Sequence, residues 1–185
     1  PSYAVPGPPA ILQLGTTNTY PRGGIRSPDD DMGQEVLRGL DAALAELRLP
    51  LCEKAGYKRG ATDFSSQVAR LRATNCDLVV LATVVRETIG AYTEARRGGW
   101  QVPMLVTASG YTEQTHQLGG RIMDGLYGVV LSPHPYAEDA NSRLAEWIER
   151  YTRLYKIEPN TWSVMAYPGA DMFIQALRLA GPHPS

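Results

Sequence analysis

Apolar residues recur with helical and strand-like periods that alternate along the middle of the chain. Within residues 60–72, Phe64, Val68 and Leu71 stand at i, i+4 and i+7, a spacing that predicts an amphipathic helix. Residues 76–85, CDLVVLATVV, form a continuous apolar run, which is typical of a strand buried on both faces. The expected elements are a helix over 32–47, a strand over 49–55, a helix over 60–72, a strand over 76–85, a helix over 86–100, a strand over 102–108, a short helix over 112–118 and a strand over 124–132.

This alternation favours an α/β fold, a parallel doubly wound sheet with helices on both faces. Thr62 or Asp63 is the expected N-cap of the helix within residues 60–72. In such sheets, ligands bind at the carboxyl ends of the strands, where the loops open a crevice. The loops expected at this crevice are residues 82–86, 107–111 and 131–135.

The two ends of the chain lack the alternation. Prolines and other turn-forming residues interrupt residues 1–28, although the apolar run at 10–14 is a candidate strand. Amphipathic helices are expected over 141–155 and 160–181, with Pro168 predicting a kink or a restart in the second. We therefore expect an irregular segment at 1–28, an α/β ligand-binding lobe at 29–132, and a crossover with a helical segment at 133–185.

Composition narrows the partners of the chain. The formal net charge is −1, so no basic field suggests nucleic acid or an anionic membrane. No apolar run approaches the roughly 20 residues of a membrane helix. The first residues lack the basic and apolar regions of a signal peptide. A cytosolic protein, a mature exported one and a fragment all stay open on composition alone.

The sequence carries only weak signals for a metal site or for redox-active cysteines. Cys52 and Cys76 form no CxxC pair, and the histidines are scattered, so a zinc site is not expected. Two buried free thiols are the favoured interpretation, with a disulfide as the alternative in an oxidising compartment. Asp29, Asp30 and Asp31 lack the alternate ligand spacing of a calcium loop and favour a solvated acidic loop before a helix. No metal and no cofactor is therefore predicted.

The crevice loops carry no catalytic pattern. The sequence has no GxSxG, P-loop or HExxH motif, and no nucleophile or acid–base pair at the strand ends, so we expect no enzyme. Arg86 is either part of an exposed pair with Glu87 or the partner of an anionic ligand. Thr107, Ser109 and Tyr111 offer hydroxyls that serve either a ligand or a turn. Such a site is suited to holding a small molecule.

Four stretches of the sequence resemble a known family. They are DDDMGQEVLRGLDAAL, GYKRGATDFSSQVARLRATNCDLVVLATVVRETIGAYTEARRGGW, LGGRIMDGLYGV and ERYTRLYKIEPNTWSVMAYPGADMFIQAL. They are similar to the periplasmic substrate-binding proteins of ABC importers, in the branched-chain amino-acid-binding group with the type I periplasmic binding fold. The resemblance covers residues 29–181. It implies an exported, periplasmic protein of two lobes that closes on a ligand and is presented to a membrane permease.

The resemblance also implies ligand contacts in three loops of the second lobe. The residues at these places are Asp31 and Met32, then Thr83, Val84, Val85 and Arg86, then Thr107, Ala108, Ser109 and Tyr111. Members that bind α-amino acids place an aromatic residue where this chain has Val84 or Val85, and a carboxylate where it has Ala108. Because an ammonium group buried without a partner is costly, the favoured ligand is a neutral or anionic, more apolar compound such as an aromatic or short organic acid, with Arg86 as the candidate anion partner and an amino acid as the alternative.

The chain departs from the family in length. Members are about twice as long, and their first lobe and the strand before the DDxxG motif have no clear counterpart here, unless residues 10–14 supply that strand. The two C-terminal helices of members pack on the first lobe, so their apolar stripes are expected here to be exposed or buried in a homo-oligomer. A ligand-sensing domain of a receptor or regulator is the alternative function, since the fold serves both.

Overall fold

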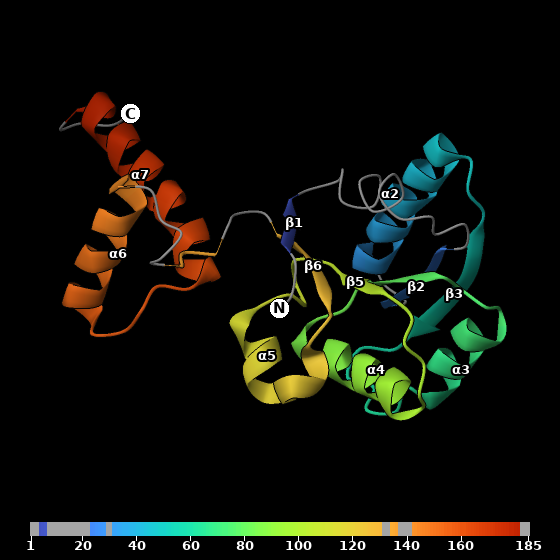
Figure 1. Cartoon of the computed structure of the whole chain (residues 1–185). Helices are drawn as coiled ribbons and strands as arrows, with labels where there is room; N and C mark the ends of the chain where they lie inside the picture. Colours follow the sequence, from blue (N-terminus) through green and yellow to red (C-terminus); the bar gives the residue numbers. More distant parts are fainter. Residues whose placement is uncertain (1–3, 7–22, 29–30, 131–133, 137–141, 182–185) are drawn as a thin grey trace. The chain divides into compact units, whose positions relative to one another are not determined.

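The computed structural model describes residues 4–6, 23–28, 31–130, 134–136 and 142–181 (Figure 1). The chain forms two compact units, Pro1–Val130 and Leu131–Ser185, which are described separately.

A parallel sheet forms the centre of the first unit. Its strands are β1 (Ala4–Pro6), β2 (Gly23–Pro28), β3 (Leu51–Tyr57), β4 (Leu78–Leu81), β5 (Met104–Val106) and β6 (Tyr127–Val130). Their order is β1-β6-β5-β4-β2-β3, and each neighbouring pair is parallel. All four residues of β4 are buried, as the continuous apolar run predicts.

Helices of the first unit cover both faces of this sheet (Figure 1). They are α2 (Asp31–Leu47), α3 (Ser65–Ala73), α4 (Val85–Arg97), α5 (Glu113–Gly119) and the 3-10 helix η1 (Gly120–Met123). Val80 packs with Leu37 and Leu40 of α2. Val79 and Leu81 point to the other face and join the larger core with α3 and α4. This period of two confirms the predicted α/β fold.

Strand β2 corrects the expectation that residues 1–28 are irregular. It lies inside the sheet, where Ile25 is in register with Val80 of β4 and Lys54 of β3. Its sequence, GGIRSP, has one large apolar residue and breakers at both ends, so strand periodicity does not reveal it. Main-chain pairing with two neighbours stabilises the strand instead. The candidate strand at residues 10–14 lies outside the described residues.

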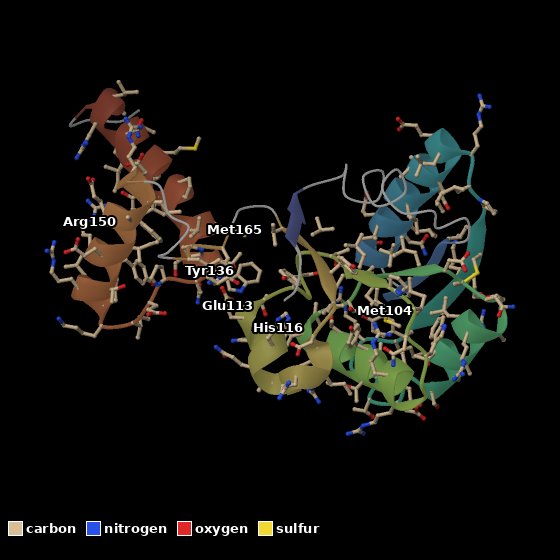
Figure 2. All side chains as sticks on the ribbon, viewed as in Figure 1. Met104, Glu113, His116, Tyr136, Arg150 and Met165 are labelled. Carbon is tan, nitrogen blue, oxygen red and sulfur yellow. A yellow bond between two sulfur atoms is a disulfide. The ribbon has the colours of Figure 1, made fainter. Side chains whose placement is uncertain are left out.

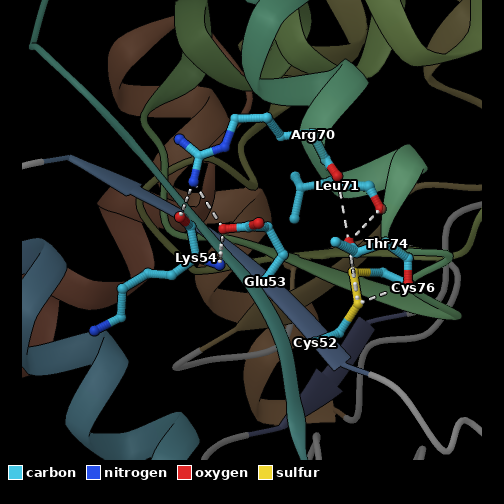
Figure 3. A network of polar contacts seen from close by, with 7 residues as sticks. All are labelled: Cys52, Glu53, Lys54, Arg70, Leu71, Thr74 and Cys76. Carbon is cyan, nitrogen blue, oxygen red and sulfur yellow. Dashed lines mark hydrogen bonds and ion pairs between the residues drawn. A yellow bond between two sulfur atoms is a disulfide. The ribbon is translucent and has the colours of Figure 1, made fainter.

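A disulfide joins Cys52 and Cys76, whose Cα atoms are 5.9 Å apart, so the favoured prediction of two free thiols was wrong (Figure 3). Cys52 is the second residue of β3, and Cys76 lies in the turn between α3 and β4. The two residues are 24 positions apart in the sequence, and the packing of α3 against β3 brings them together. This explains why their spacing carries no signal.

Helix α3 begins later than predicted. Its N-cap is Phe64, and no side chain caps the helix. Asp63 forms a turn instead, because its carboxylate accepts the backbone N–H of Ser65 at 2.9 Å. Hydrogen bonds from the backbone and side chain of Ser65 hold the pKa of the Asp63 carboxyl below its usual value.

The second unit contains α6 (Ser142–Tyr155) and α7 (Thr161–Ala180). Asn160 caps α7 in a capping box with Ser163, and the helix runs through Pro168. The rings of Trp147 and Tyr167 lie 5.5 Å apart, centre to centre, and join the two helices. A groove of about 800 Å³ lies along this contact and is lined by residues of both helices, Arg150 among them (Figure 2).

Candidate functional site

The candidate site lies at the carboxyl edge of the sheet, where β2, β4 and β5 are neighbours in the order β5-β4-β2. Leu81, the last residue of β4, is in register with Val106 of β5 and Arg26 of β2. The loops that follow β4 and β5, and the start of α2 after β2, therefore emerge at the same edge. This brings together the three loops that the sequence predicts as ligand-binding.

The start of α2 contributes two of the predicted residues. Asp31 is the first residue of the helix and is exposed. Met32 follows it, and its side chain is not among those described. A carboxylate in the first turn of a helix is favourable because the helix N-terminus carries partial positive charge. Asp31 is therefore placed where it stabilises α2 and also faces solvent.

Thr83 lies beneath the surface and is fully buried. Its hydroxyl hydrogen-bonds to the hydroxyl of Thr88 at 2.7 Å, and its carbonyl accepts the hydroxyl of Ser109 at 3.3 Å. The hydroxyls of Thr107 and Ser109 are also bonded to each other, at 3.1 Å. These hydroxyls form a network that joins the loops after β4 and β5.

Gly110 allows the two loops to approach closely. A Cβ atom at this position would stand 2.3 Å from Oγ1 of Thr88, 2.5 Å from the carbonyl oxygen of Thr83 and 2.6 Å from Cγ2 of Val106. The backbone of Gly110 is not left-handed. Glycine is therefore needed at this position for space and not for backbone conformation.

The first turn of α4 forms the part of the edge that solvent reaches. Val84 is the N-cap in extended conformation without a side-chain cap, and Val84 and Val85 are half-buried. The first amide bonded within the helix is that of Thr88, to Val84 at 2.8 Å. The preceding amides point out of the helix and favour negative charge. Arg86, in this turn, is exposed.

Tyr111 is packed tightly at the next strand. Its ring covers Gly128 of β6, where a Cβ atom would come within 2.1 Å of the ring. It also meets the ring of His116 on α5 edge-on, at 5.8 Å between centres. Ala108 beside it is half-buried. Tyr111 is therefore held in position by both neighbours and is half-buried.

Sequence reasoning missed one carboxylate at this edge. Glu87 directly follows Arg86, yet it is only 6% exposed. Its Oε1 accepts the backbone N–H of Gly60 at 3.5 Å, and its Oε2 is buried without a hydrogen-bond partner in the described part of the chain. The sequence suggested an exposed Arg86–Glu87 pair, and only the packing of α4 on the loop before α3 shows that Glu87 turns inward.

In the described part of the chain, metal-binding clusters, membrane-spanning helices and the residues after β6 contribute nothing to this edge. Across the described residues, no cluster of three or more metal-binding side chains is found, and none of the described helices is long and apolar enough to cross a bilayer. A further crevice loop was expected at residues 131–135; of these, 131–133 lie outside the described residues, and His134 and Pro135 belong to the second unit.

Solved structures share this fold. A leucine-binding protein of Thermotoga maritima MSB8 matches with a TM-score of 0.81 and 19% identity, over 94% of this chain and 49% of that protein. A substrate-binding periplasmic protein of Ralstonia solanacearum matches with a TM-score of 0.79 and 20% identity, over 96% and 51%. An ABC-transporter solute-binding protein of R. palustris, in complex with benzoate, matches with a TM-score of 0.72 and 14% identity, over 89% of this chain and 43% of that protein. The chain thus spans about half of these proteins or less.

Sequence comparison extends the result from fold to family. No curated protein matches the chain significantly. The family model described as "Periplasmic binding protein" matches residues 21–185, which include β2, the whole carboxyl edge and both C-terminal helices. The chain therefore belongs to the periplasmic binding protein family.

Proposed function

We propose that the chain is the ligand-binding lobe of a solute-binding component of an ABC importer, and that it binds a small organic molecule at the carboxyl edge of β2, β4 and β5. The observation that carries the proposal is the meeting of the three predicted loops at one edge of the sheet. Family membership over residues 21–185 supports it. The groups at this edge are hydroxyls, methyl groups and helix amides, which suit binding without catalysis.

We propose an aromatic or short organic acid as the ligand, in preference to an amino acid. Val84, Val85 and Ala108 offer apolar surface and no charge. The first-turn amides of α4 and the exposed Arg86 favour a carboxylate. Glu87 is buried and is not available to an ammonium group. The benzoate complex of the R. palustris protein shows that one structural neighbour holds such an acid.

The exposed apolar side chains of the second unit support the proposal that this lobe has a protein partner. Helix α7 buries none of its residues, and Phe173 and Met172 are 65% and 70% exposed. A helix this apolar is expected to pack against further protein. In the proposed function that protein is a first lobe like the one the longer relatives possess, and a second copy of the chain is the alternative.

The setting we propose is the periplasm, with a membrane permease as the partner. The Cys52–Cys76 disulfide supports an oxidising compartment. In the family, the permease receives ligand from the closed binding protein, so the permease contact requires both lobes.

Isothermal titration calorimetry tests the ligand class. The chain, and a longer version that carries a first lobe, are titrated with benzoate and with leucine. The proposal expects heat of binding from benzoate and none from leucine, with higher affinity in the longer version. Tight binding of leucine without binding of benzoate would contradict it.

A further inference from the structure

The disulfide between Cys52 and Cys76 closes off the segment of chain that carries α3 (Figure 3). Cys52 lies in β3, which among the described strands pairs with β2 alone and stands at the edge of the sheet. Beside the bridge, Arg70 of α3 forms an ion pair with Glu53 at 2.8 Å and donates to the carbonyl of Lys54 at 3.3 Å. The bridge thus fastens the end of α3 to a strand that is held on one side.

The closed segment contacts α4 at two places in its first two turns. The backbone N–H of Gly60 donates to Oε1 of Glu87, the residue after Arg86 of the ligand loop. The ring of Phe64 lies against Gly90, where a Cβ atom would stand 2.3 Å from Cε2 of the ring. Gly60 and Phe64 both lie between Cys52 and Cys76, whose sequence separation is 24. A movement of the segment that the disulfide closes is therefore transmitted to the start of α4.

We propose that the Cys52–Cys76 disulfide holds the ligand loop 83–86 in place through these two contacts, and that Glu87, which makes the first of them, is the positioning residue next to the loop. The proposal rests on the binding function proposed above, but the loosening of the loop is measured without ligand. In native proteins, neighbouring residues commonly open together at a free energy below that of global unfolding.

An external dithiol can open the bridge by thiol–disulfide exchange. Cys52 is half-buried whereas Cys76 is 4% exposed. The thiolate of the dithiol therefore attacks the sulfur of Cys52, and the Cys76 thiolate leaves. The second thiol of the reagent then displaces Cys52 and closes a ring. One protein disulfide becomes two thiols, and one dithiol becomes a cyclic disulfide.

Native-state hydrogen exchange of the 185-residue chain, with and without dithiothreitol, tests this coupling. The expected result is that the amides of α3 and the Thr88 amide of α4 exchange about tenfold faster after reduction. The Thr115 amide, which is bonded to Thr112 of the loop before α5, is expected to keep its rate. Equal acceleration at Thr88 and Thr115, or none at Thr88, would overturn the proposal.

Two variants of the oxidised chain separate the hydrogen bond from the charge of Glu87. Glu87→Ala removes the acceptor and is expected to speed exchange at Thr88 several-fold. Glu87→Gln keeps an acceptor oxygen and is expected to retain the original rate. Equal rates in the two variants would overturn the positioning role. Because these readouts need no ligand, failure to bind benzoate would overturn the proposed function and leave the exchange result standing.

Discussion

Replacement of Gly110 by alanine tests the close contact between the two site loops. The added methyl group would overlap Oγ1 of Thr88 at 2.3 Å and the carbonyl oxygen of Thr83 at 2.5 Å. Overpacking of this kind costs about 1–3 kcal/mol. Loss of the Thr83–Thr88 hydrogen bond adds about 1 kcal/mol. Reduced entropy of the unfolded chain offsets about 0.4–1 kcal/mol. We therefore expect the free energy of unfolding to fall by about 1–3.5 kcal/mol.

Urea unfolding measures this difference in the first unit. Tryptophan fluorescence in a W147F/W162F background reports on Trp100, which lies in that unit. With a denaturant slope of about 2 kcal/mol per molar urea, the midpoint is expected to fall by about 0.5–1.8 M.

Gly39→Ala is the matched control for the glycine substitution. Gly39 is exposed within α2, and a Cβ atom there meets nothing within 4 Å. Alanine at this position is expected to raise stability by about 0.5–1 kcal/mol. The reasoning would be refuted if Gly110→Ala unfolded at the same urea concentration as the parent chain, or if both variants lost stability equally.

Three further outcomes follow from the structure. Arg86→Ala is expected to weaken benzoate binding by about 1–2 kcal/mol in calorimetry while leaving the urea midpoint unchanged, because Arg86 is exposed; unchanged affinity would remove Arg86 from the site. In the double variant C52A/C76A, the free energy of unfolding is expected to fall by about 3.5 kcal/mol, from the loop-entropy relation for a separation of 24 residues. A decrease below about 1 kcal/mol in urea unfolding would contradict this. The Asp63 carboxyl has a lowered pKa in the folded chain. Its contribution to the free energy of unfolding is therefore present above the unfolded-state pKa of about 4 and is lost as the pH falls toward the folded-state pKa. The difference in urea midpoint between the parent chain and Asp63→Asn should be larger at pH 7 than at pH 3.

The sequence predicts the central elements of the lobe because their signals are local. The run Leu78–Leu81 is apolar at each position and becomes the buried strand β4. Phe64, Val68 and Leu71 form the buried face associated with α3. Strand β2 escaped prediction because an interior strand held by main-chain bonds needs no hydrophobic pattern of its own.

The meeting of the loops at one edge of the sheet was predictable from the sequence, whereas the orientation of their side chains was not. The ends of β4 and β5 meet as parallel strands require, so the loops 82–86 and 107–111 are neighbours. The sequence does not show that Thr83 is buried and bonded to Thr88, or that Glu87 turns toward Gly60. These orientations depend on the packing of α4 against the sheet and on the loop before α3, which are contacts between segments distant in the chain.

A two-dimensional NMR titration of the longer, two-lobed version with benzoate tests the central claim most directly. The account predicts that the backbone amides of residues 83–88 and 107–111 shift with ligand concentration, and that leucine leaves them unchanged. Shifts confined to residues outside the carboxyl edge of the sheet, or a response to leucine without a response to benzoate, would contradict it.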